Sequence, residues 1–340
     1  MSFARCIDTA IVIPARDEAE RIAHCLDALA PQCSERVQVI LVVNNTGDDT
    51  AEIANAAATA LHINLHVLNV AYPAQRGVGE ARRLGGSEAL RSLPHLNHIL
   101  TTDADCRVAP DWVARNLYHL QEADAVCGKV DLHPGETAWL AGLDKSLQDI
   151  EDTYRGLVQE AFARYGSNCT DLRGSHGQTP GASLGFTRSA YVATGGFEPI
   201  PCGEDRQIIR TLRSLGRRVR HASDIRVAAS CRLTGRAAGG MADTLRARLS
   251  GDNYAADDCL PRADDLIHQI RSGAVPSWPP QLAPGDCVPA RDLPAHCNKL
   301  RRFLAAAVPA NAAAMPPKSP TQSLTSSAQQ PIYAAPSTDG

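Results

Sequence analysis

Two aspartates separated by one alanine follow a short apolar stretch in the first third of the chain. His98 to Thr102 reads as a buried strand, and Asp103-Ala104-Asp105 comes directly after it. An open α/β sheet binds its ligand at the carboxyl ends of its strands, and a hard divalent cation on a diphosphate needs only one or two protein carboxylates. The pattern therefore indicates a metal site with Asp103 and Asp105 as ligands. A turn that caps the helix beginning near Asp111 is the structural alternative.

Polar residues also follow the first two predicted strands. Pro14-Ala15-Arg16-Asp17-Glu18 ends the first apolar run, and Asn44-Asn45-Thr46-Gly47-Asp48-Asp49-Thr50 ends the second. Carboxyl ends of parallel strands share one edge of a sheet, so these residues are predicted to surround the carboxylate pair. Short polar groups in that place can bind a base and a ribose. Capping of the following helices by Asp17 and Asp48 is the alternative.

Two further stretches carry charges that could act on a phosphate or a hydroxyl group. Gly77 to Gly85 opens a helix but has Arg82 where a dinucleotide fingerprint needs its third glycine. Arg82 could instead meet a phosphate or lie on a solvated basic face. Glu204 and Asp205 stand together at a predicted helix start. One of them could be a general base, and helix capping is the other interpretation.

The elements that must position these residues alternate between strand and helix over the first 120 residues. A mostly parallel mixed sheet flanked by helices, an α/β Rossmann-like fold, is the expected outcome. The predicted strands are 9–14, 37–43, 65–70, 98–102, 123–130 and 218–227, and the predicted helices include 18–30, 50–60, 80–93, 136–165 and 205–215. Residues 166–185 are polar and glycine-rich, which predicts a mobile loop beside a site.

The predicted organisation has three parts. Residues 1–236 form the α/β domain, and residues 237–308 form a small extension of short helices and irregular segments, because prolines interrupt its helical patterns. Residues 309–340 have almost no large apolar side chains to offset the entropy of ordering, so this tail is predicted to be disordered.

Composition restricts the class of partner. A net charge of −3 and 4% aromatic residues argue against nucleic-acid binding. No apolar run approaches the roughly 18 residues of a membrane-spanning helix. Eleven cysteines are dispersed without a C-x-x-C pair, and the first residues do not resemble a signal peptide, which favours a reduced, cytoplasmic chain.

Taken in order and spacing, these motifs resemble glycosyltransferase family 2, of GT-A fold, over about residues 8 to 236. Pro14 to Glu18 resembles the family's first-strand motif, with Asp17 in place of Asn. Asn44 to Thr50 resembles its D-D-G-S-x-D-G-T stretch, and Gly79 to Gly85 its G-x-A-R-N-x-G. The match continues through Asp103-Ala104-Asp105 as the DXD motif, Gly181-Ala182-Ser183 with Gly195-Gly196-Phe197 on the acceptor side, and Glu204-Asp205 as the catalytic pair.

The resemblance implies a nucleotide-diphospho-sugar donor, a hydroxyl acceptor and Mn²⁺ or Mg²⁺ bound by Asp103 and Asp105. It makes Asp205 the base, with Glu204 beside it, and predicts inversion by direct displacement. Asn44 stands where the family usually has Asp, which leaves the choice between a UDP- and a GDP-sugar open. The absence of a Q-x-x-R-W motif argues against a processive synthase. The residues implied in donor binding are Pro14, Arg16, Glu18, Asn44, Asn45, Arg82, Asp103 and Ala104.

Two other functions compete with a glycosyltransferase. A catalytically inactive binding or scaffold protein of the same fold would be expected to lack Asp105 or Asp205, and both are present. A sugar-phosphate nucleotidyltransferase would resemble a G-T-R loop after the first strand, where this chain has Pro14-Ala15-Arg16. The glycosyltransferase interpretation is therefore preferred.

Overall fold

The computed structural model describes residues 6–137, 145–235, 241–249, 254–283 and 285–306. The strands are β1 (Thr9–Ala15), β2 (Val37–Asn44), β3 (Leu65–Val70), β4 (His98–Thr101), β5 (Cys106–Val108), β6 (Ala125–Leu132), β7 (Leu184–Thr187) and β8 (Val219–Ala229). The α-helices are α1 (Ile22–Leu29), α2 (Thr50–Ala60), α3 (Gly77–Ser92), α4 (Trp112–His119), α5 (Lys145–Tyr165), α6 (Arg188–Thr194), α7 (Glu204–Ser214), α8 (Met241–Leu249), α9 (Ala263–Ser272) and α10 (Leu293–Ala306).

The strands form one sheet in the order β3-β2-β1-β4-β7-β6-β8-β5. β1 runs parallel to β2 and β4, with Ala15 opposite Val43 and Val12 opposite Thr101. Four of the seven neighbouring pairs in the described sheet are parallel, and β7 is antiparallel to both of its neighbours. The predicted α/β class with a mostly parallel mixed sheet is confirmed. The register brings the carboxyl ends of β1, β2 and β4 to one edge.

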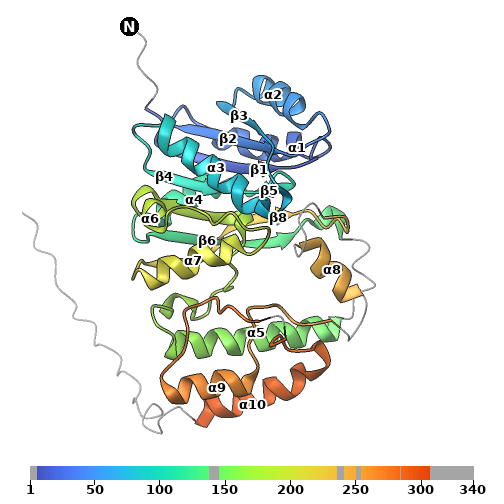
Figure 1. The fold of residues 1–340 in the computed structure, drawn as a ribbon, viewed down its shortest axis with the longest axis vertical. Helices are drawn as coiled ribbons and strands as arrows, with labels where there is room; N and C mark the ends of the chain where they lie inside the picture. Colours follow the sequence, from blue (N-terminus) through green and yellow to red (C-terminus); the bar gives the residue numbers. More distant parts are fainter. Residues whose placement is uncertain (1–5, 138–144, 236–240, 250–253, 284, 307–340) are drawn as a thin grey trace, which may run out of the picture.

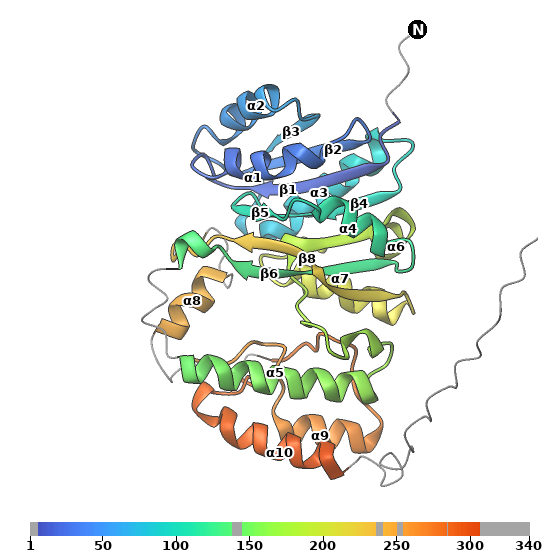
Figure 2. The same cartoon turned by 180° about the vertical axis from the view of Figure 1, so that it is seen from behind.

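Helices cover both faces of the sheet because alternate residues of each central strand point to opposite sides. Ile11 and Ile13 of β1 join a core with α1, α2 and α4. Ala10 and Val12 join a second core with α3, α6 and α7. The two layers of helices lie behind and in front of the sheet (Figure 1, with the reverse side in Figure 2).

A third core lies beyond α7 and is built on α5. It combines apolar residues of α5, such as Tyr154 and Phe162, with Leu266 of α9, Leu300 of α10 and Trp278 between those helices. In both views α5, α9 and α10 form a layer of their own at the end of the molecule opposite α2 (Figures 1 and 2). The predicted extension therefore packs against a helix from the middle of the chain.

Several predicted boundaries were wrong. Helix 18–30 begins only at Ile22, and helix 80–93 begins earlier, at Gly77. The predicted loop 166–185 contains short 3₁₀ turns and the start of β7, and β5 was missed. Of the predicted helix 136–165, α5 covers Lys145 to Tyr165. Residues 138–144, the predicted domain boundary at 236 and the predicted tail 309–340 lie outside the described residues.

Two further observations bear on the environment of the protein. Among the described residues, none of the helices combines the length and apolarity that crossing a membrane requires. All eleven cysteines belong to the described part and none forms a disulfide.

The start of α3 packs so closely on the segment after α6 that a side chain has no room. A Cβ added to Gly79 would lie 2.1 Å from the backbone oxygen of Glu198, and the Gly79 N–H donates to the Ile200 carbonyl at 3.2 Å. Gly79→Ala is therefore expected to lower the free energy of unfolding by about 1–3 kcal/mol, measured by urea denaturation.

Gly156 is the matched control for Gly79. It lies on the exposed side of α5, and a Cβ there would meet nothing within 4 Å. Gly156→Ala is expected to raise the free energy of unfolding by about 0.5–1 kcal/mol, because alanine is the better helix former. Equal effects of the two substitutions would show that the close approach at Gly79 does not matter for stability.

Candidate active site

The loops that follow β1 and β2 hold each other in place. The Glu18 N–H donates to Thr50 Oγ1 at 2.9 Å, and the Ala19 N–H donates to Asp48 Oδ2 at 3.1 Å. Asp17 Oδ1 in turn accepts the Gly47 N–H at 2.9 Å. Asp17 thus acts across the two loops, whereas Asp48 both crosses to Ala19 and accepts the N–H and hydroxyl of Thr50 at the start of α2. Their bonds fix the backbone on which Glu18 is carried into the site.

The two asparagines after β2 have different surroundings. Asn44 is buried at the end of the strand. The side-chain amide of Asn45 donates to the Tyr72 carbonyl at 2.8 Å and accepts the Tyr72 N–H at 3.3 Å. In this conformation the amide of Asn45 ties the end of β2 to the segment after β3.

Arg82 is the central cation of the site. Its side chain is 4% exposed and lies on the inner side of α3, where one guanidinium bridges Asp103 after β4 and Glu204 at the start of α7. The Arg82 Nη2 to Asp103 Oδ1 distance is 2.5 Å. A buried charge needs such partners, because desolvation without them is unfavourable. Arg82 thus connects three elements that are far apart in sequence.

Arg232, which follows β8, bridges a second pair of carboxylates. Its Nη1 donates to Glu18 Oε2 at 2.7 Å, and its Nη2 contacts Glu18 Oε1 and lies 3.1 Å from Asp105 Oδ2. Glu18 is 5% exposed, so this fork is its main compensation. The two arginines therefore face four carboxylates.

Asp205 is held by backbone donors rather than by an arginine. Its Oδ2 accepts the Gly181 N–H at 2.8 Å, and its Oδ1 accepts the Arg206 N–H at 2.7 Å. Gly181 also accepts the Thr101 hydroxyl at 2.6 Å, and a Cβ there would come within 2.4 Å of Arg82 Nη2. Only a glycine lets this backbone lie between the base candidate, β4 and the arginine.

The residues present fit a divalent cation. Carboxylate oxygens of Asp103 and Asp105 and the sulfur of Cys106 lie within 4.8 Å of one another. Two arginines facing four carboxylates leave two negative charges, which one divalent ion would balance. Hard oxygen ligands suit Mn²⁺ or Mg²⁺. Burial raises the pKa of the Cys106 thiol well above its usual value, so the carboxylates are the ligands expected.

Electrostatics in the site also favour an additional cation. Burial raises the pKa of Asp103 and that of Asp105, although Arg82 and Arg232 act in the opposite direction. Burial likewise raises the pKa of Glu204 to about 7. A positive charge placed among these groups would stabilise their ionised forms.

The structure brings most of the predicted residues together. Glu18, Asp103, Asp105, Arg82 and Glu204 belong to one network of ion pairs, and Asp205 adjoins it through Gly181. Pro14 in β1 and Ala104 in the segment after β4 are both buried. Arg16 points outward, with 46% of its side chain exposed and Asp17 at 3.8 Å.

Sequence reasoning missed Arg232. Nothing in its neighbourhood, Cys231-Arg232-Leu233, forms a motif. Its role depends on β8 ending beside β6 and near the loop after β1, which only the folded chain reveals. Gly181 was noticed only as part of a motif. Its close approach to Arg82 could not be read from the sequence.

Two of the hollows on the described surface bear on the position of the site. One of about 220 Å³ reaches Asp105 and is lined by Glu20, Arg21, His24, Cys25, Asp105, Cys106, Arg107, His133 and Glu136. The larger one, of about 690 Å³, is lined by residues at the starts of β6 and β8 and by the segment after α5. Because β6 and β8 run parallel to β4 in the sheet, that hollow lies at the opposite edge from the carboxylates.

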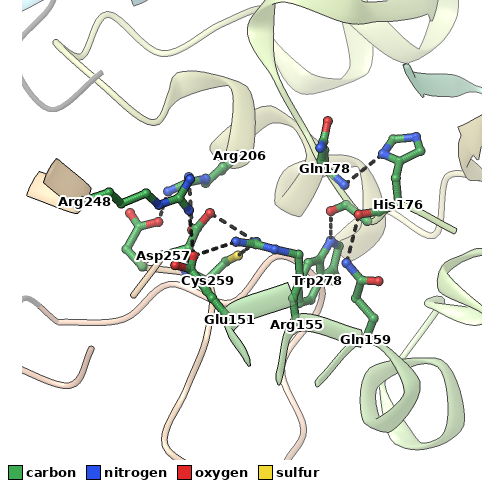
Figure 3. Close-up of polar contacts among 12 residues, drawn as sticks. Glu151, Arg155, Gln159, His176, Gln178, Arg206, Arg248, Asp257, Cys259 and Trp278 are labelled. Carbon is green, nitrogen blue, oxygen red and sulfur yellow. Dashed lines mark hydrogen bonds and ion pairs between the residues drawn. The ribbon is translucent and has the colours of Figure 1, made fainter. Parts of the chain in front are cut away.

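Two groups of polar contacts link the α5 layer to segments near Asp205, and Figure 3 shows Arg155, Arg206, Asp257 and Trp278 among them. Arg206, next to Asp205, pairs with Asp258 and lies 3.3 Å from Asp257, which Arg155 of α5 also contacts at 3.2 Å. On the other side, the Trp278 indole N–H donates to the Gly177 carbonyl at 2.9 Å, four residues before Gly181. The segments that carry Arg206 and Gly177 are therefore anchored to this layer.

Comparison with known proteins gives the family of the chain. The family model described as glycosyl transferase family 2 matches residues 10–189, which is more than half of the 340 residues. The chain belongs to glycosyl transferase family 2. The matched range contains Glu18, Arg82, Asp103, Asp105 and Gly181, and ends before the Glu204-Asp205 pair. The predicted family is thus confirmed.

Individual relatives of this family 2 chain are distant. Glycosyltransferase AglE of Haloferax volcanii is 30% identical over 125 residues, which cover 36% of this chain and 38% of that protein. The mannosyltransferase PcManGT of Pyrobaculum calidifontis, solved with GDP-Man and Mn²⁺, is 19% identical with a TM-score of 0.49, covering 91% of this chain and 76% of that one. TarS of S. aureus, solved with UDP, is 15% identical with a TM-score of 0.48, covering 66% and 60%.

The stretch aligned with glycosyltransferase AglE spans less than half of the length of that protein. Because both TM-scores are below 0.5 and both identities are below 25%, the assignment of the chain rests on the family match.

Proposed function

We propose that this protein is a glycosyltransferase that moves a sugar from a nucleotide-diphospho-sugar to an acceptor hydroxyl with inversion, one sugar at a time. The observation that carries the proposal is the group of carboxylates at the ends of β1 and β4 and the start of α7, held by Arg82 and Arg232 in a chain of family 2. Donor sugar and acceptor are left open. A cytoplasmic location stays a prediction from the cysteine pattern.

The metal-binding part of the proposal concerns Asp103 and Asp105. They would hold Mn²⁺ or Mg²⁺, which when bound supplies positive charge to the leaving diphosphate. Asp103 keeps its orientation through Arg82, whose buried guanidinium cannot turn away without leaving two carboxylates unpaired. The donor nucleoside would lie along Glu18 and Asn44, at the neighbouring strand ends.

Asp205 suits the role of general base better than Glu204. Two backbone N–H groups take two of the about four acceptor positions of the Asp205 carboxylate, so it can also accept the proton of an acceptor hydroxyl. Glu204 is 2% exposed and faces Arg82, so an acceptor would have to break that pair to reach it. Asp205 would remove the proton as the hydroxyl attacks the anomeric carbon from the face opposite the diphosphate.

The layer of α5, α9 and α10 belongs to the same working unit in this proposal. Its contacts reach Arg206 and Gly177, close to Asp205 in the chain and in space. The α/β domain predicted for residues 1–236 would then depend on the extension predicted for 237–308.

Binding of the donor nucleotide is expected to require a divalent metal and Asp105. Isothermal titration of UDP and of GDP, each with and without Mn²⁺, tests this directly. Removing Mn²⁺ or changing Asp105→Ala should weaken binding of the preferred nucleotide by roughly tenfold or more, the value of a charge-assisted contact. Equal affinity under all these conditions would refute the metal site.

Asp111→Ala is the matched control. Asp111 is an exposed aspartate after β5 that pairs with Arg115 on the surface. Its loss should leave nucleotide affinity unchanged. An activity assay on a panel of UDP- and GDP-sugars, read as release of the free nucleoside diphosphate, then separates a transferase from an inactive binding protein.

A further inference from the structure

Arg232 occupies a position that matters for the order in which metal and donor bind. Its guanidinium contacts both Glu18 and Asp105. The other aspartate proposed as a metal ligand, Asp103, forms an ion pair with Arg82. Each aspartate proposed as a metal ligand thus already has an arginine beside it. The two arginines differ in burial, with side-chain exposures of 4% for Arg82 and 19% for Arg232.

The difference in burial decides which arginine can move. The Arg82 side chain leaves α3 and lies between the segment after β4 and the start of α7, and Gly181 packs against its guanidinium. Arg232 lies in an irregular segment after β8. Its Nη2 is 3.1 Å from Asp105 Oδ2, which is longer than the 2.7 Å between its Nη1 and Glu18 Oε2. Releasing Arg232 from Asp105 breaks one ion pair at a partly exposed place, whereas releasing Arg82 would leave the buried Glu204 and the half-buried Asp103 without a counter-charge.

We propose that Arg232 is a built-in counter-ion that competes with the metal for Asp105 and yields to it only when the donor diphosphate is present. This inference rests on the proposed function. A metal ion arriving alone must displace a guanidinium that also satisfies Glu18. A diphosphate that arrives with the metal ion carries two or more negative charges. The displaced Arg232 guanidinium can then pair with a phosphate group, which arginine binds well. Metal and donor then bind together.

The charges of the site disfavour a donor that arrives without a metal. A diphosphate added without a metal would bring negative charge into a site already rich in carboxylates, where like charges repel. Arg232 therefore serves as a positioning and selectivity residue for the metal–donor pair.

The test measures Mn²⁺ binding itself, by loss of the free-ion signal in electron paramagnetic resonance. Each protein is titrated with Mn²⁺ in three samples, one without nucleotide, one with UDP and one with GDP. In the wild type, the preferred nucleotide should tighten Mn²⁺ binding strongly. In Arg232→Gln, Mn²⁺ alone should bind roughly tenfold more tightly than in the wild type, because a charge-assisted competitor is gone. The gain from adding nucleotide should shrink accordingly.

Arg21→Gln is the matched control. Arg21 lines the same hollow as Asp105 but pairs with Glu136 at 2.8 Å. Its loss removes the same charge from the neighbourhood without touching Asp105, so the affinity for Mn²⁺ alone should stay within about twofold of the wild type. Arg232→Lys, which keeps a charge but loses the fork, should lie between wild type and Arg232→Gln, and serves in its place if the glutamine variant does not fold.

The outcomes separate this inference from the proposed function. If Asp105→Ala abolishes Mn²⁺ binding while Arg232→Gln leaves the affinity for Mn²⁺ alone unchanged, the counter-ion role is refuted and the metal site stands. Equal effects of Arg21→Gln and Arg232→Gln on the affinity for Mn²⁺ alone would also refute the counter-ion role and leave the metal site standing. If Mn²⁺ binding is absent with and without nucleotide, or does not depend on Asp105, both proposals fail.

Discussion

Replacing Asp205 by asparagine is expected to lower turnover by a factor on the order of 10² to 10⁴ while leaving the affinity for donor nucleotide unchanged. Asparagine keeps the size of the side chain and one acceptor oxygen for the Gly181 N–H, whose bond to Asp205 measures 2.8 Å. It cannot take up a proton from an attacking hydroxyl. The expected loss therefore falls on chemistry and spares binding.

The measurement combines two readouts on the same variant. Release of UDP or GDP from the preferred sugar donor gives turnover, with water as the acceptor until the natural one is found. Isothermal titration of the nucleotide with Mn²⁺ gives the affinity. Weaker nucleotide binding together with unchanged turnover of bound donor would move Asp205 to the nucleotide site and make Glu204 the candidate base.

Glu204→Gln is the control for the neighbouring carboxylate. Glu204 pairs with Arg82 and is buried, so its replacement removes an ion pair instead of a base. Turnover should fall less than in Asp205→Asn. A larger fall in Glu204→Gln than in Asp205→Asn would reverse the assignment.

Arg82→Met is expected to lower the free energy of unfolding by about 3–5 kcal/mol, the largest stability effect predicted for this chain. Methionine fills a similar space but leaves the buried Glu204 and the half-buried Asp103 without a counter-charge. Such a loss is a large part of the roughly 5–15 kcal/mol that stabilises an ordinary domain. Urea denaturation monitored by circular dichroism measures it.

Arg76→Met, at the residue directly before the same helix, is the matched control. Arg76 and Glu80 form an ion pair at the start of α3 in which the Arg76 side chain is 54% exposed. Solvent screens such a pair, so the expected loss is about 0–1 kcal/mol. Adding Glu204→Gln to Arg82→Met should restore part of the lost stability, because one of the two unpaired charges is removed. Additive losses in the double variant would argue against a direct pair.

The carboxylate pair could be located from sequence because its signals are local. An apolar strand pattern ends at Thr102, and the register of β4 beside β1 then places Asp103 and Asp105 at the edge where β1 and β2 also end. Strand alternation similarly predicted the sheet. The Glu204-Asp205 pair was recognisable as adjacent acids at a helix start, but the sequence does not reveal which of them faces Arg82.

The missed elements have physical causes. β7 contains Gly185, and a Cβ there would lie 2.6 Å from Asn116 Oδ1, so this strand needs a residue that sequence patterns assign to loops. Arg232 bonds to Glu18, 214 residues away in the chain, a separation at which no local pattern carries information.

The long separation between α5 and its partners has a consequence for biosynthesis. α5 ends at Tyr165, whereas α9 starts at Ala263 and α10 at Leu293. On the ribosome, the sheet strands up to β8 emerge before the helices that cover α5. Its apolar face, with Tyr154 and Phe162, must therefore stay exposed until the last part of the chain appears. Chaperone binding to nascent chains halted before residue 263 should then be stronger than to those released after residue 306.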